Sequence, residues 1–285
     1  MLALGFGLTA ALLWAVHDLL ARKLSQGARL LPMIATVLAS GAALLVPVAV
    51  VAGGWGRMTG AAYGIAVLSG LAFALAIGAL YRAFSLAPVR LVSPVIGAYP
   101  LVTFSIAMAQ GRAVTAGDWA AAAAIVGGIA VVALTADRNG PEARAGGPGV
   151  AMAWAALSAV AFAATFALGQ AATRVGADLP VILTARLVAL AAIMALMLVR
   201  GGVAWPARGQ WPVLALMGAF DAGALGLVTA AGVLAQAEYA SVASSLFGVL
   251  TVLLAAWFLD ERMRAVQALG IALVFTGIGL LGLQG

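Results

Sequence analysis

Long apolar stretches alternate with short polar or glycine-rich connections along the whole chain. A helix needs roughly 20 mostly apolar residues to cross a bilayer, and ten stretches meet that length. We expect helices over residues 2–21, 32–52, 61–81, 91–110, 118–136, 149–170, 180–199, 210–231, 241–259 and 265–283. The pattern therefore predicts an all-α integral membrane protein with ten transmembrane helices.

This series of apolar stretches occurs twice. A shift of 148 residues brings Pro32 onto Pro180, Gly70 onto Gly218 and Thr103 onto Thr251 without an insertion. We expect a first five-helix repeat over residues 1–136, a polar linker over 137–148 and a second five-helix repeat over 149–285. Because five is odd, the second repeat enters the membrane from the opposite side. Inverted repeats around a midplane site are a recurring architecture of secondary transporters.

Composition agrees with a location in the membrane. Hydrophobic residues make up 65% of the chain and charged residues only 8%, a balance that suits lipid better than water. The first stretch differs from a cleavable signal peptide, because it lacks a basic start and carries Trp14, His17 and Asp18. The net charge of +6 comes from basic residues scattered singly between helices, so we expect no nucleic-acid partner.

The basic residues also predict an orientation. Eleven of the 15 lysines and arginines lie in the connections that follow the odd-numbered helices, three lie in the other connections, and Arg186 lies inside a helix. By the positive-inside rule the richer set is cytoplasmic, which places both termini outside.

The sequence offers little to an enzyme or a metal. It has no cysteine and one histidine, which excludes thiolate sites and zinc sites with several histidines. It also lacks a Gly-x-Ser-x-Gly elbow and a phosphate-binding Gly-x-x-x-x-Gly-Lys loop. We therefore expect no cofactor, no metal and no catalytic residue. A membrane-embedded hydrolase could pair only His17 with Asp221 as acid and base.

Sequence motifs near the C-terminus point to a family. The segment Leu259-Asp260-Glu261-Arg262 is followed by Gln267, Gly270 and Gly277, and the stretch 235–241 precedes it. With the paired five-helix repeats, this resembles the EamA-type members of the drug/metabolite transporter superfamily over essentially the whole chain. The resemblance implies a transporter and leaves the substrate open. It implies both termini in the cytoplasm, which is the opposite of the orientation that the basic residues predict. It also implies an arginine in the second helix of each repeat, which Arg186 provides and Leu38 does not.

Matched residues in the two repeats predict a binding pocket. In the first helix Trp14 and His17 share one face, and their counterparts in the sixth helix are Phe162 and Thr165. Ser158 extends the second of these faces. In the fourth helix Tyr99 and Thr103 share a face, and their counterparts in the ninth helix are Phe247 and Thr251. The set predicts an aromatic chamber whose hydroxyls orient a solute, although aromatic residues at helical spacing also occur in ordinary helix packing.

Pro94 and Pro100 lack amide donors, so we expect the helix over 91–110 to bend more readily than its counterpart, which has Val242 and Gly248 at these positions.

Asp221 is the clearest ionisable residue at membrane depth. It lies halfway along the helix over 210–231, beside small residues that allow close helix packing, and its counterpart in the first repeat is Phe73. A charge there is costly, about 2.5 to 3.5 kcal/mol on insertion scales. Two interpretations remain open: a proton-binding or substrate-binding role, and an ion pair with Arg186 that locks two helices together.

His17 and Asp18 form a second polar pair. A histidine changes protonation near neutral pH, which suits a coupling site or a gate. Successive residues of a helix point about 100° apart, so the two side chains need not face one cavity. The alternative is a polar helix end in which Asp18 pairs with Arg22.

Together these features predict a secondary transporter of the inner membrane that moves a small metabolite, such as an amino acid or an organic cation, by alternating access. The sequence suits an exporter or exchanger, acting as a monomer or a homodimer, with protons as a candidate coupling ion. A membrane-embedded enzyme and a channel are the alternatives.

Overall fold

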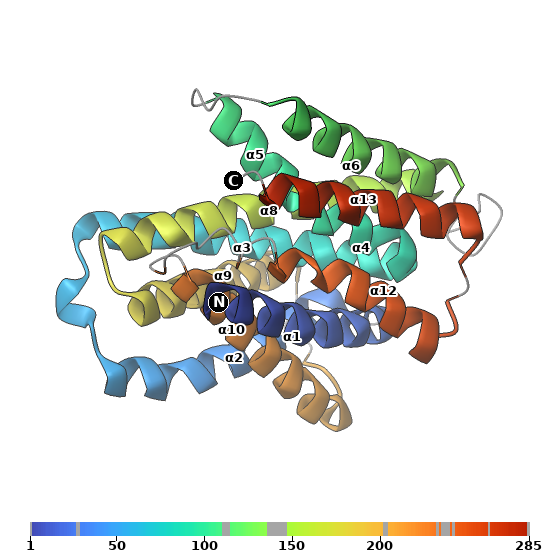
Figure 1. Ribbon diagram of the computed structural model, residues 1–285. Coiled ribbons are helices and arrows are strands. Elements are labelled where there is room, and N and C mark those ends of the chain that lie inside the picture. Colours follow the sequence, from blue (N-terminus) through green and yellow to red (C-terminus); the bar gives the residue numbers. More distant parts are fainter. Residues whose placement is uncertain are drawn as a thin grey trace.

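The structure is a computed structural model, and it describes residues 2–26, 29–109, 115–135, 147–201, 205–231, 234, 240, 243–261 and 263–283. Within those residues every regular element is a helix (Figure 1). The first repeat contains α1 (Leu2–Ser25), α2 (Leu30–Ala52), the short η1 (Trp55–Arg57), α3 (Gly60–Leu86), α4 (Val89–Gly97), α5 (Tyr99–Ala109) and α6 (Ala116–Leu134). The second contains α8 (Gly147–Arg174), α9 (Asp178–Val199), the short η2 (Arg208–Gln210), α10 (Trp211–Ala230), α12 (Phe247–Phe258) and α13 (Ala265–Leu283).

These helices account for ten membrane spans. Among the described residues, seven segments are long and apolar enough to cross a bilayer, one of them running from Val89 to Ile106 through α4 and α5. Three shorter apolar helices, over residues 116–132, 243–258 and 265–280, supply the rest. The chain is thus an all-α, multi-pass membrane protein with two five-helix repeats.

Some helices run further than their apolar stretches. α1 ends at Ser25 rather than at residue 21, and α8 ends at Arg174 rather than at residue 170. Both have basic residues in the last turn, where a positive charge interacts favourably with the helix dipole. The helices therefore continue through these basic residues, beyond the end of each apolar stretch.

The fourth span of each repeat is interrupted. The helix expected over 91–110 is divided at Ala98. There the backbone amides of Ala98 and Leu101 donate to the carbonyls three residues earlier, those of Val95 and Ala98, instead of four residues earlier as in an α-helix. In the second repeat a turn occurs at Leu246, which is the counterpart of Ala98, and α12 begins only at Phe247. The interruption is therefore common to both repeats, although the prolines occur in one.

The connections show that the repeats are inverted. Glu261, after α12, contacts Arg22 at the end of α1 and Arg90 at the start of α4, so these three connections lie at one end of the molecule. At the other end Thr59, before α3, donates a hydrogen bond to the Val175 carbonyl that follows α8. The ends of α1 and α8 are equivalent in the two repeats, yet they lie at opposite ends of the molecule.

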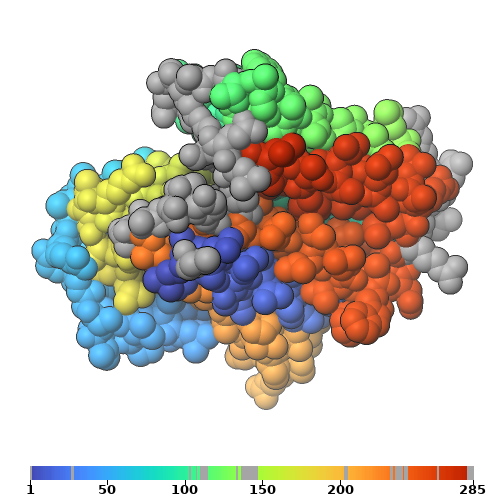
Figure 2. Space-filling view, in the orientation of Figure 1, coloured from blue at the N-terminus to red at the C-terminus, as the bar shows by residue number. Residues whose placement is uncertain are grey.

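Helix packing follows the same pseudo-symmetry. α3 packs against α8 and α9, and its counterpart α10 packs against α1 and α2. The equivalent helices α6 and α13 lie side by side at one edge, and α12 lies beside α1 (Figures 1 and 2). Gly70 on α3 approaches the Ala185 carbonyl on α9, and Gly218 on α10 approaches the Val37 carbonyl on α2. At both places the absence of a side chain permits close packing.

Candidate functional site

A cavity lies where α1, α3, α8, α10 and α12 meet the interruption between α4 and α5. It is lined by Trp14, His17, Asp18, Ile77, Leu80, Ile96, Tyr99, Phe162, Phe166, Asp221 and Phe247. The centre of a water-sized sphere can reach about 20 Å³ of it. That is room for water rather than for a metabolite. Both repeats contribute to the lining, so the cavity lies at their interface.

The four aromatic residues predicted from the sequence all line this cavity. The Trp14 and Phe247 rings meet edge to face, with their centroids 6.0 Å apart. Phe166 is a further lining residue that the sequence analysis missed. Its ring lies 5.7 Å from that of Trp14, 5.1 Å from that of Tyr99 and 5.9 Å from that of Phe162. Its signal was its position one helical turn after Phe162.

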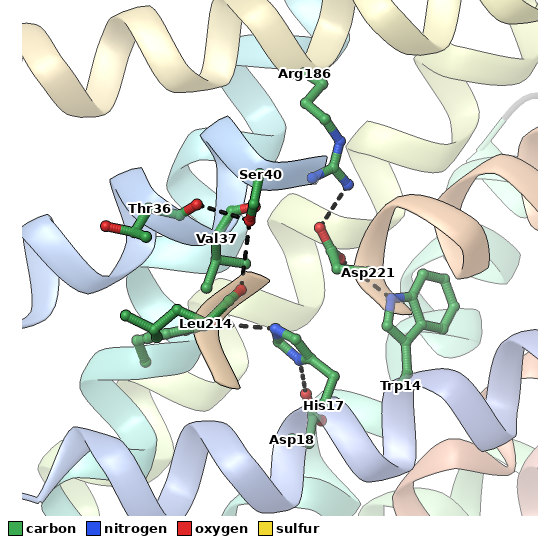
Figure 3. A network of polar contacts seen from close by, with 10 residues as sticks. Trp14, His17, Asp18, Thr36, Val37, Ser40, Arg186, Leu214 and Asp221 are labelled. Atoms are coloured by element: carbon green, nitrogen blue, oxygen red, sulfur yellow. Dashed lines mark hydrogen bonds and ion pairs between the residues drawn. The ribbon is translucent and has the colours of Figure 1, made fainter. Parts of the chain in front are cut away.

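The Asp221 carboxylate on α10 accepts hydrogen bonds from two other helices. Arg186 on α9 donates from Nη2 to Asp221 Oδ2 over 2.6 Å, and Trp14 on α1 donates from Nε1 to Asp221 Oδ1 over 3.3 Å (Figure 3). Asp221 is 3% exposed and Arg186 is fully buried. The ion pair considered from the sequence is therefore present, and the same carboxylate lines the cavity.

Arg186 occupies a tight and incompletely paired environment. Its guanidinium lies over the Phe73 ring, 5.6 Å from the centroid, and Gly41 leaves it room where any side chain would collide with it. Its Nε and Nη1 have no hydrogen-bond partner among the residues that the structure describes. Unsatisfied buried donors are costly, so Arg186 retains bonding capacity beyond Asp221.

His17 and Asp18 both line the cavity and contact one another. His17 Nδ1 lies 2.9 Å from Asp18 Oδ1, and His17 Nε2 lies 3.1 Å from the Tyr81 hydroxyl on α3. The sequence offered an alternative pair of Asp18 with Arg22, but Asp18 is bound by His17 (Figure 3). Arg22 is bound instead by Glu261. Tyr81 gave no local signal, because it lies 64 residues from His17 in the chain.

The predicted hydroxyl groups point elsewhere. Thr165 and Thr251 donate to the carbonyls of Ala161 and Phe247 in their own helices, and Ser158 donates to the Ala76 carbonyl on α3. None of these three lines the cavity. A hydroxyl within an apolar helix has no water to bind, so a nearby backbone carbonyl satisfies it. The Thr103 side chain lies outside the described residues.

Glu261 connects three segments at one end of the cavity region. Its Oε1 accepts from Arg22 Nε over 3.3 Å, and its Oε2 accepts from the Arg90 amide over 3.4 Å. Asp260, just before it, has a φ of 53°, a left-handed conformation that aspartate tolerates better than most residues. This motif at the helix junction therefore joins the ends of α1 and α4 to the second repeat.

Comparison with known proteins agrees with this architecture. The sequence profile of the EamA-like transporter family matches residues 1–134 and 149–283, one match in each repeat. A solved structure titled "Crystal structure of protein" superposes with a TM-score of 0.68 at 20% identity, covering 99% of this chain and 96% of that chain. At that identity the likeness concerns the fold alone. No curated protein matches the chain significantly.

Proposed function

Because the chain belongs to the EamA-like transporter family, and is thus a membrane transporter of the drug/metabolite superfamily, we propose that it is a secondary active transporter working by alternating access. Its solute is a small metabolite, either an amino-acid-like compound or an organic cation, which it exports or exchanges across the inner membrane. The site is the cavity between the repeats.

One observation carries this proposal: a buried carboxylate and four predicted aromatic rings share one cavity at the repeat interface. Trp14, Tyr99, Phe162 and Phe247 offer flat apolar surfaces, and Asp221 offers a negative charge that a protonated amine would neutralise. Such a site selects small solutes that carry a positive group beside an apolar body.

Asp221 also suits a coupling role. An intramembrane carboxylate that binds either a proton or a cationic solute exchanges one for the other. In the described conformation Arg186 holds the carboxylate at 2.6 Å. A solute or a proton that takes the place of Arg186 weakens this bond between α9 and α10, which links occupancy to helix movement. His17, one turn from Trp14, is a second proton-binding candidate.

The interruptions at Ala98 and Leu246 supply the points of bending. The cavity must widen to admit a metabolite, since its volume in this conformation is only about 20 Å³. Tyr99 stands at one interruption, and its hydroxyl lies 2.9 Å from Ser244 Oγ near the other. Movement at either interruption therefore reshapes the aromatic wall directly.

A thermal-shift screen tests the proposal. Purified protein is heated with amino acids and with organic cations, because a ligand at 100 times its Kd stabilises the state that it binds by about 2.7 kcal/mol. We expect stabilisation by compounds with a protonated amine, and loss of that stabilisation in Tyr99→Ala but not in Trp257→Ala, whose side chain is 80% exposed. Hits that Tyr99→Ala binds normally would contradict the site.

A further inference from the structure

A second, much larger cavity opens between α2, α3, α8 and α9. Its volume is about 1000 Å³, against about 20 Å³ for the cavity between the repeats, which we call the aromatic cavity. Most of its walls are apolar, and three arginines also line it: Arg29, Arg82 and Arg200. We call this cavity the arginine groove.

The three arginines lie at one end of the molecule. Arg29 directly precedes α2, Arg82 lies in the last turns of α3, and Arg200 directly follows α9. All three are exposed, and none has an ion-pair partner among the described residues. Arg22 and Arg90, at the same end, are by contrast paired with Glu261. The groove therefore gathers positive charge that the described protein does not neutralise.

The rest of the groove suits hydrocarbon. Leu75 on α3 and Leu196 on α9 are exposed, and the half-buried Trp154 on α8 also lines the groove. The space beside Gly78 is unoccupied, because a Cβ at this position would meet no atom within 4 Å. Apolar walls that carry positive charge at one end match a molecule with a negative head and a long apolar tail.

We propose that the arginine groove binds an anionic phospholipid, with the head-group phosphate at Arg29, Arg82 and Arg200 and an acyl chain along α3 and α9. Basic pockets between transmembrane helices on the cytoplasmic side are suited to anionic head groups. The positive-inside rule places these three connections on that side, where the leaflet is negatively charged. The site is independent of the aromatic cavity, so it stands whether or not that cavity binds the transported solute.

Lipid binding to the full-length, delipidated protein in detergent tests this proposal by native mass spectrometry. The probes are phosphatidylglycerol and phosphatidylcholine with identical acyl chains. Each arginine near an anionic head contributes about 1 kcal/mol, or about fivefold in affinity. We expect wild-type protein to prefer phosphatidylglycerol, and the triple variant Arg29→Gln, Arg82→Gln, Arg200→Gln to lose on the order of 100-fold in its affinity for that lipid.

A steric variant tests the apolar part separately. A Cβ at Gly78 meets no atom within 4 Å, so Gly78→Leu should extend its side chain into the groove and weaken binding of both lipids, while the melting temperature stays at or above that of wild type. Gly64→Leu on the same helix, also in open space, and Arg208→Gln, a basic residue outside the groove lining, are the matched controls and should bind lipid normally.

Three results would overturn the proposal. They are equal binding of the two lipids by wild-type protein, an unchanged preference in the triple variant, and tighter binding of glycerol phosphate than of the lipid, which would assign the arginines to a soluble anion. Should the triple variant not fold, the single variant Arg82→Gln and Gly78→Leu decide the question by the same comparison.

Discussion

Arg186 Nη2 donates a 2.6 Å hydrogen bond to Asp221 Oδ2, and neither residue is more than 3% exposed. The counterparts of these two residues in the first repeat are Leu38 and Phe73, so the charge pair belongs to one repeat only. Phe73 nevertheless contacts Arg186 through its ring. The second repeat thus supplies both charges, and the first repeat packs against them. Relative movement of the two repeats would therefore change the surroundings of the ion pair.

Replacing Asp221 should separate its two roles. Asp221→Asn leaves Arg186 buried without a counter-charge, which should lower the free energy of unfolding by about 3 to 5 kcal/mol. Adding Arg186→Leu, the residue of the first repeat, should restore most of that stability, because no buried charge remains. We expect both variants to lack transport in reconstituted vesicles. A double variant that is stable and transports normally would reduce the pair to a structural role.

The aromatic wall should matter in proportion to contact with the solute. Truncating Tyr99 or Phe247 to Ala should weaken binding of the solute found by thermal shift by about 1 to 3 kcal/mol, the value of one well-packed aromatic contact. Trp257→Ala serves as control, since that side chain is 80% exposed on α12. Isothermal titration of folded protein measures the effect, and equal affinities in all three variants would argue against this wall as the binding surface.

The two glycine contacts test the pseudo-symmetry of the packing. A methyl group at Gly70 or Gly218 collides with a backbone carbonyl of the neighbouring helix, so Gly70→Ala and Gly218→Ala should each destabilise the protein by about 1 to 3 kcal/mol. Gly226→Ala, on the same helix as Gly218, meets no atom within 4 Å and should be neutral or slightly stabilising. Unfolding in detergent provides the comparison, and a cost at Gly226 as large as at Gly218 would be inconsistent with the packing described.

Much of the fold could be predicted from the sequence, because apolar length and the repeat fix the number of spans. The interruption at Leu246 could not. Pro94 and Pro100 indicated bending in the first repeat, whereas no proline marks the equivalent position in the second. There Gly248 allows α12 to approach Phe275 and the Ser93 carbonyl closely, a tertiary contact that local propensity does not report. That the span formed by α4 and α5 bends more readily than its counterpart in the second repeat stays a prediction.

The site was predictable only where symmetry marked it. Trp14, Phe162, Tyr99 and Phe247 occur as matched pairs, and all four line the cavity. Tyr81 has no such signal, since its contact with His17 joins α3 to α1. The predicted hydroxyls of Ser158, Thr165 and Thr251 do not line the cavity, because hydrogen bonds to backbone carbonyls satisfy them elsewhere.

Glu261 should hold one end of the transporter closed. Glu261→Gln removes the charge that Arg22 and Arg90 contact, which should favour opening at that end by about 1 kcal/mol, or about fivefold. The chain has no cysteine, so a single Ile77→Cys in the cavity reports access to a membrane-impermeant maleimide. We expect faster labelling from the Glu261 side of sealed vesicles. Asp260→Asn is the control, and equal labelling of both variants would deny Glu261 this role.

Solute counterflow tests the central claim, which is that one cavity between the repeats faces the two sides of the membrane in turn. Vesicles containing the protein are loaded with the unlabelled solute identified by thermal shift and diluted into a trace of the labelled form. Alternating access predicts transient accumulation of label above its outside concentration, and no accumulation with Asp221→Asn. Simple equilibration without an overshoot would indicate a channel, and an unchanged overshoot in Asp221→Asn would place transport outside this cavity.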